Sequence, residues 1–124
     1  MFPVDPITVS DYTKAREFWT SVFKTVGYSP QHEFEGYQTF GPKEDCPNFS
    51  IAELRSPGPS PKQHLKFEWD DEKLVRDFYK KAVEAGATAL KTPGLVSEYE
   101  VILGRFLDLD GNMVDVFCEA SQLA

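Results

Sequence analysis

An internal repeat with an offset of about 60 residues limits what this chain can fold into more than any other feature of its sequence. The segment Asp11–Trp19 aligns with Asp71–Tyr79, and both contain, in order, an acidic first residue, Arg, an acidic residue, Phe and a second aromatic residue. Repeats indicate copies of one supersecondary unit. A chain of 124 residues has room for two such copies.

Both aligned segments are predicted to be helices, because their apolar residues follow the three-and-four spacing of one buried stripe. The stripe extends from Tyr12 to Val26 in the first copy and from Leu74 to Val83 in the second. Each helix also has residues suited to its two ends: Ser10 or Asp11 and Asp70 or Asp71 as N-caps, and Gly27 and Gly86 after the last turn.

Strand-like segments precede and follow each helix, so the order strand, helix and three strands occurs twice. We therefore predict an α+β fold of two tandem βαβββ modules, with a curved mixed sheet open as a cup and the helices on its outer face. A Pro-rich linker at 56–61 separates the pseudo-symmetric halves, 1–58 and 59–124, of a single domain. The predicted strands are Val4–Val9, Gln31–Glu35, Tyr37–Phe40, Phe49–Leu54, His64–Trp69, Thr88–Lys91, Tyr99–Leu107 and Met113–Cys118.

The charge balance excludes two classes of partner. Thirteen Lys and Arg residues against 20 Asp and Glu residues give a net charge of −7, which repels phosphate backbones and acidic membranes. The start of the chain lacks the basic and apolar segments of a signal peptide, and no apolar stretch could cross a bilayer. We expect a cytoplasmic protein that binds neither nucleic acid nor membranes. Its two cysteines, Cys46 and Cys118, should be reduced.

Alternation along the strands predicts which side chains face away from the helices, into the cup. In the strand at 64–69, the apolar residues at odd positions should face the helix, which leaves His64 on the open side. In the strand at 49–54, the small residues are placed under the helix, so Phe49 and Glu53 should face the cup. In the last strand, Asp115 and Phe117 should do so.

The repeat sharpens this prediction, because it relates His64 to Val4 and Glu53 to Asp115. Pseudo-symmetry thus predicts four positions, of which three carry ligand-type side chains and one carries valine. One His and two carboxylates can bind a divalent ion such as Fe(II), Mn(II), Zn(II) or Ni(II). Two alternatives stay open: Asp115 could accept hydrogen bonds from the preceding turn, and Glu53 could be a solvated carboxylate at a strand end.

Three motifs in this order resemble the vicinal oxygen chelate superfamily, which contains glyoxalase I, extradiol dioxygenases and the bleomycin resistance proteins. The segments Val9–Asp11, Phe18–Trp19 and Gly27–Tyr28 resemble the family's opening pattern "VSD…FY…LGY". The segment His64–Phe67 resembles its "HxxF" strand, and Asp108–Asp115 resembles its "DPDGNxxE" turn and final strand. The resemblance covers nearly the whole chain.

The resemblance implies a metal site of His64, Glu53 and Asp115, in which Val4 replaces the first-strand ligand. It also implies a small-molecule enzyme with lyase, isomerase or dioxygenase chemistry, with His64 and Asp115 as catalytic residues and a homodimeric assembly. The alternative is a metal-free protein of the bleomycin-resistance type that sequesters its ligand without converting it.

Four further residues are candidates for substrate binding. Phe49 and Phe117 would give the pocket an apolar wall, which suits an aromatic metabolite with one oxygenated end. Tyr99 and Arg105 could hold that end, because a guanidinium gives a carboxylate a two-point grip.

Overall fold

The computed structural model describes residues 6–42, 48–54 and 62–119, and it divides the chain into two compact units. Residues 1–61 form the first unit, called module 1, and residues 62–124 form the second, called module 2. Val4, Cys46 and the predicted linker lie outside the described residues. The structure defines each module by itself, so a single cup made of both sheets stays a prediction.

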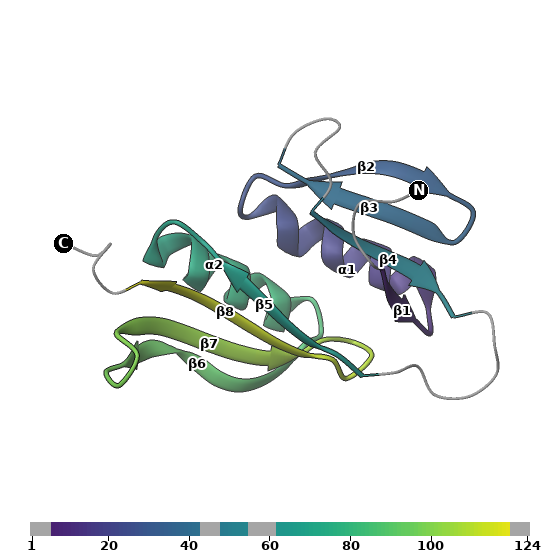
Figure 1. Cartoon of the computed structure of the whole chain (residues 1–124). Helices are drawn as coiled ribbons and strands as arrows, with labels where there is room; N and C mark the ends of the chain where they lie inside the picture. Colours follow the sequence, from purple (N-terminus) through teal and green to yellow (C-terminus); the bar gives the residue numbers. More distant parts are fainter. Residues whose placement is uncertain (1–5, 43–47, 55–61, 120–124) are drawn as a thin grey trace. The chain divides into compact units, whose positions relative to one another are not determined.

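The two modules have the same order of elements, which confirms the α+β fold with two βαβββ units (Figure 1). Each helix covers one face of a four-stranded mixed sheet, with strand orders β1-β4-β3-β2 and β5-β8-β7-β6. In each sheet one pair is parallel and the others are antiparallel. Module 1 contains β1 (Ile7–Val9), α1 (Tyr12–Lys24), β2 (Ser29–Phe34), β3 (Tyr37–Gly41) and β4 (Phe49–Glu53), and module 2 contains β5 (His64–Glu68), α2 (Glu72–Glu84), β6 (Thr88–Val96), β7 (Val101–Leu107) and β8 (Met113–Glu119).

The helix ends lie where the sequence places them. The Asp11 carboxylate accepts a hydrogen bond from the Lys14 amide at 3.1 Å, and the Asp71 carboxylate accepts one from Leu74 at 3.0 Å. Each bond satisfies an amide that the first helical turn leaves without an intrahelical partner. Gly27 and Gly86 follow α1 and α2 with φ of 82° and 115°, a conformation that glycine adopts without steric cost. At 13 residues each, these two helices are too short and too polar to cross a membrane.

An aromatic cluster forms the core of module 1, and it corrects the predicted facing of β4. The Phe49 ring lies 4.8 Å from Trp19 and 5.2 Å from Phe23 of α1, measured between centroids. Phe49 is 7 % exposed and Ile51 is fully buried. The prediction that placed Phe49 opposite the helix was wrong, because its ring, together with Ile51, buries far more apolar area against α1 than Ser50 and Ala52 could.

In module 2 the predicted facing is confirmed. Phe67 of β5 packs against Phe78 of α2 at 5.4 Å, whereas His64 is exposed on the other side of the strand. Strand β6 is longer than predicted and continues through Pro93, with irregular pairing to β7 around that residue. An edge strand tolerates proline because its outward N–H groups have no partner strand. The predicted strand was too short because it was ended before Pro93 and Gly94, which β6 includes.

Candidate functional site

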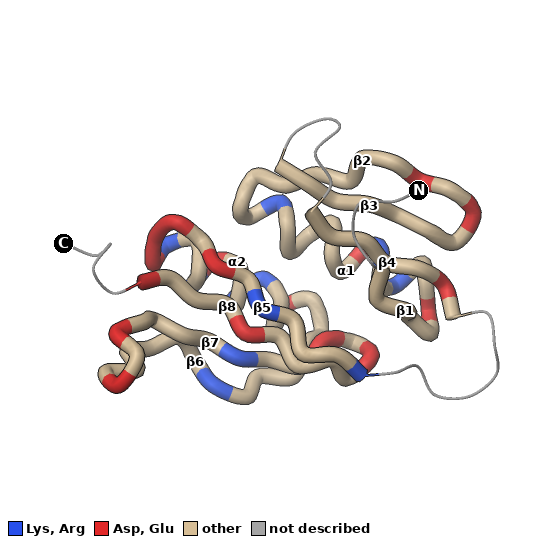
Figure 2. The backbone as a smooth tube through the Cα atoms, viewed as in Figure 1, with Lys and Arg blue, Asp and Glu red and all other residues tan. Residues whose placement is uncertain are grey.

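Charged side chains form a row across the face of module 2 that α2 does not cover, called here the open face. The strand pairing places Lys66 of β5 beside Asp115 of β8, Asp115 beside Arg105 of β7, and Arg105 beside Lys91 of β6. Paired residues share a face of a sheet. Figure 2 shows these basic positions on β5, β7 and β6, with an acidic position on β8 between them. This acidic protein therefore carries a row of three basic side chains and one carboxylate at this site, and two of the basic side chains stand beside the carboxylate.

Asp115 is the centre of this row. Its carboxylate accepts hydrogen bonds from Arg105 Nε at 2.6 Å and Arg105 Nη2 at 3.1 Å, one on each oxygen. His64 Nε2 lies 2.7 Å from the Oδ2 atom. The Asp115 side chain is only 8 % exposed, whereas those of Arg105 and His64 are 37 % and 43 % exposed. A buried carboxylate thus holds two partners that solvent and ligands can reach.

These contacts keep Asp115 ionised. Burial alone would raise the pKa of the Asp115 carboxyl, but the hydrogen bonds from Arg105 and His64, with the Arg105 charge, outweigh burial and lower it. The same hydrogen bond and the Asp115 charge raise the pKa of Arg105. At neutral pH the two therefore form a charged, two-point ion pair.

The turn between β7 and β8 fixes where His64 and Asp115 lie. Buried Asp108 accepts hydrogen bonds from the Asn112 amide at 2.8 Å and from Asn112 Nδ2 at 2.9 Å. Asn112 Oδ1 then accepts a 2.8 Å bond from the backbone N–H of Gln63, and the Met113 N–H donates to the Gln63 carbonyl at 3.0 Å. The start of β5 is thus joined to the start of β8. The Asp108–Asn112 turn therefore sets the register that brings His64 to Asp115.

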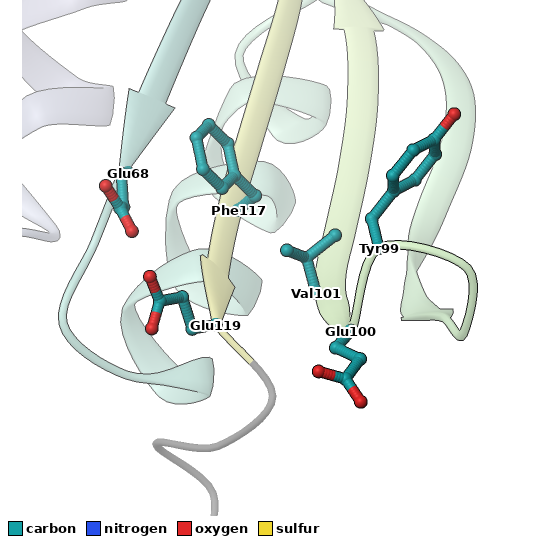
Figure 3. A pocket seen from close by; sticks show the side chains of 6 residues that line it. All are labelled: Glu68, Tyr99, Glu100, Val101, Phe117 and Glu119. Carbon is teal, nitrogen blue, oxygen red and sulfur yellow. The ribbon is translucent and has the colours of Figure 1, made fainter.

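A pocket of about 450 Å³ lies on the same open face (Figure 3). Two sides are seen in the figure, with Glu68, Phe117 and Glu119 on one and Val101, Tyr99 and Glu100 on the other. Glu100 has φ of 53°, which is unusual for a residue with a side chain.

Phe117 and Tyr99, two of the predicted substrate-binding residues, line this pocket, but other predicted residues lie elsewhere. Arg105 does not line the pocket with Tyr99; it grips a carboxylate of its own chain, Asp115. Phe49 was predicted to bind substrate because it was expected to face the cup. It packs instead in the core of module 1. Glu100 and Glu119 were missed, and Glu68, which alternates with Phe67 along β5, was not among the predicted site residues.

Comparison with known proteins identifies the family. A model of the glyoxalase/bleomycin resistance protein/dioxygenase superfamily matches residues 4–116. The chain belongs to this superfamily. A search of curated proteins found no match.

Solved structures of the superfamily have the same fold. A glyoxalase/bleomycin resistance protein from Albidiferax ferrireducens T118 matches with a TM-score of 0.78 and 18 % identity, over 91 % of this chain and 93 % of that one. A family enzyme from Burkholderia phytofirmans PsJN matches with a TM-score of 0.68 and 19 % identity, over 92 % and 94 %. A glyoxalase-related enzyme from Fulvimarina pelagi matches with a TM-score of 0.71 and 15 % identity, over 96 % and 89 %. At these identities the likeness shows the fold alone.

The superfamily often binds a divalent metal, but the residues described here do not fit one. No three His, Cys, Asp or Glu side chains gather as a metal site within 6–42, 48–54 and 62–119. Both oxygens of Asp115 already hold the Arg105 guanidinium, whose positive charge would repel a second cation. Glu53 shares the α1 side of β4 with Phe49, and its charge acts on Tyr12 of α1. The pKa of Tyr12 is raised to about 12, chiefly by burial, then by Glu33 and to a smaller extent by Glu53.

Proposed function

We propose that this superfamily member binds a small organic molecule on the open face of module 2 without a metal ion. The observation that carries the proposal is the two-point bond between Arg105 and Asp115. The family resemblance implies that the Asp115 carboxylate binds a metal ion. In this chain the Arg105 guanidinium binds that carboxylate instead. The neighbouring pocket, with Phe117 and Tyr99 in its lining, has the size and the aromatic surface of a small-molecule site.

Metal reconstitution tests this proposal. The purified protein is incubated with one equivalent of Zn(II), Ni(II), Mn(II) or Fe(II), passed through a desalting column and analysed for metal. We expect less than about 0.1 ion per chain, because a site with a resident guanidinium holds no divalent cation. The Arg105→Met variant serves as a matched comparison, since it removes only the internal cation. Retention near one ion per wild-type chain would overturn the proposal.

The contact between His64 and Asp115 favours a second function, acid–base catalysis of a lyase or isomerase reaction. A carboxylate 2.7 Å from Nε2 fixes the orientation of the imidazole, and 43 % exposure leaves the ring accessible to a substrate. Histidine is suited to this work because its unperturbed pKa is close to neutrality. A ligand bound on the open face within reach of His64 would then exchange a proton with it.

Proton exchange distinguishes catalysis from sequestration. The α-protons of dihydroxyacetone are followed by NMR in D2O with wild-type protein, His64→Ala and His32→Ala. The last variant is a matched control, because the chain has only these two histidines and His32 lies in module 1. If His64 is catalytic, wild type and His32→Ala should exchange the protons faster than buffer does, whereas His64→Ala should exchange them at the buffer rate. Equal exchange with and without protein would count against the acid–base function and leave the binding function in place.

The homodimer and the cytoplasmic location expected from the sequence remain part of the proposal. The resemblance to the superfamily supports the homodimer. Light scattering coupled to gel filtration tests the dimer directly.

A further inference from the structure

The pocket on the open face combines negative charge with aromatic surface. Three of its six lining residues are glutamates, two are aromatic, one is valine, and none is basic. Within the described parts of the chain, the ion pairs that form involve other carboxylates, among them Glu33, Glu72, Asp77 and Asp115. Among the residues that the structure describes, the pocket glutamates thus have no cationic partner, in contrast to the nearby Asp115.

The strand register places two of these carboxylates next to the Phe117 ring. Glu68 pairs with Phe117 across β5 and β8, and Glu119 pairs with Val101 across β8 and β7. Glu119 is two residues from Phe117 on the same face of β8, which corresponds to about 7 Å. Figure 3 shows Glu68 and Glu119 on the same side of the pocket as Phe117. Both carboxylates therefore neighbour the Phe117 ring, one across the strands and one along its own strand.

We propose that this pocket takes an organic cation, an ammonium group carried on an apolar or aromatic body. The proposal rests on the small-molecule function proposed above and names its ligand class. Carboxylates offer the charge, and the faces of Phe117 and Tyr99 attract cations through their ring quadrupoles. The volume of about 450 Å³ is within the range of small-molecule sites and far larger than a bare metal ion needs.

The rest of the open face supports the same choice of ligand. The row of Lys66, Arg105 and Lys91 lies on one side of Phe117 along the strands, and Glu119 lies on the other. A ligand cation is repelled by the basic row and attracted by the glutamates, so the charge pattern gives the ligand one orientation. An anionic ligand would be excluded from the pocket by the same pattern.

Three aromatic probes of similar size test the proposal: benzyltrimethylammonium, neutral neopentylbenzene and anionic benzenesulfonate. Binding is followed by amide NMR shifts of the intact chain at low salt, with the metal reconstitution described above run separately. We expect the ammonium probe alone to shift Phe117, Val101 and Glu119. Each of the variants Glu68→Gln and Glu119→Gln should weaken it by roughly fivefold, the value expected for one charge at about 4 Å in water.

The variant Glu84→Gln is the matched control, because it removes an equally negative, exposed side chain at the end of α2, outside this pocket. It should leave the affinity unchanged. Equal or tighter binding of the neutral probe, no shift with the ammonium probe, or equal weakening by all three variants would overturn the inference. None of these results alters the proposed metal-free site, which fails only if the wild-type chain retains a divalent ion.

Discussion

Replacing Arg105 with methionine should destabilise module 2 by an amount that depends on pH. The change keeps much of the aliphatic stem but removes both hydrogen bonds to buried Asp115. Hydrogen bonds to charged groups contribute about 1.5–3 kcal/mol each, whereas exposed ion pairs contribute about 0–1 kcal/mol. Arg105 is 37 % exposed, so solvent screening places the loss between these limits. We expect about 2 kcal/mol of unfolding free energy to be lost at pH 7.

The pH dependence follows from the lowered pKa of Asp115 in the folded protein. A carboxyl with a lowered folded pKa stabilises the fold above its unfolded pKa, and this stabilisation is lost as the pH falls through the folded value. The difference between wild type and Arg105→Met should therefore narrow below about pH 4.

Urea unfolding of both proteins at pH 7 and pH 3 measures the effect. The exposed pair Lys73–Asp77 on α2 provides the control, and Lys73→Met should leave stability unchanged. A loss at pH 7 no greater than that of Lys73→Met, or a loss of the same size at both pH values, would refute the reasoning.

Three other substitutions test the fold and the positioning of the site. Phe49→Ala should lower the free energy of unfolding in urea by about 3–5 kcal/mol, because it opens a cavity against α1. A loss below about 1 kcal/mol would mean that Phe49 faces away from α1. Asn112→Ala should shift the NMR signals of the His64 ring and remove the amide-exchange protection of Gln63. Unchanged His64 signals would mean that the turn does not position His64. Asp71→Ala should cost about 1 kcal/mol as a lost N-cap, and no change would mean that another residue caps α2.

The repeat made the fold predictable, because its apolar periodicity and its caps are local signals. Asp71 and Gly86 end up as the cap and the helix end that their residue types favour. The facing of β4 was not predictable in the same way, since either Phe49 with Ile51 or Ser50 with Ala52 alternates correctly. Only the volume available under α1 decides between them, and that volume depends on side chains distant in sequence.

His64 and Asp115 were predictable as neighbours at the site, but the bonds that Asp115 makes were not. Alternation placed His64 and Asp115 on one face, and the structure confirms that they meet. The Arg105–Asp115 pair depends on the register of β7 against β8, which the Asp108–Asn112 turn sets. Counting outward from that turn would have paired Arg105 with Asp115. The family resemblance instead implied that Asp115 was a metal ligand.

Manganese titration followed by NMR tests the central claim most directly, namely that Asp115 is held by Arg105 and His64 rather than available to a divalent metal. Mn(II) broadens the signals of nuclei close to it. One equivalent added to the wild-type chain should leave the amide signals of Met113–Phe117 unbroadened, because no metal binds at Asp115. Broadening that is centred on Asp115, and that His64→Ala abolishes, would contradict the account.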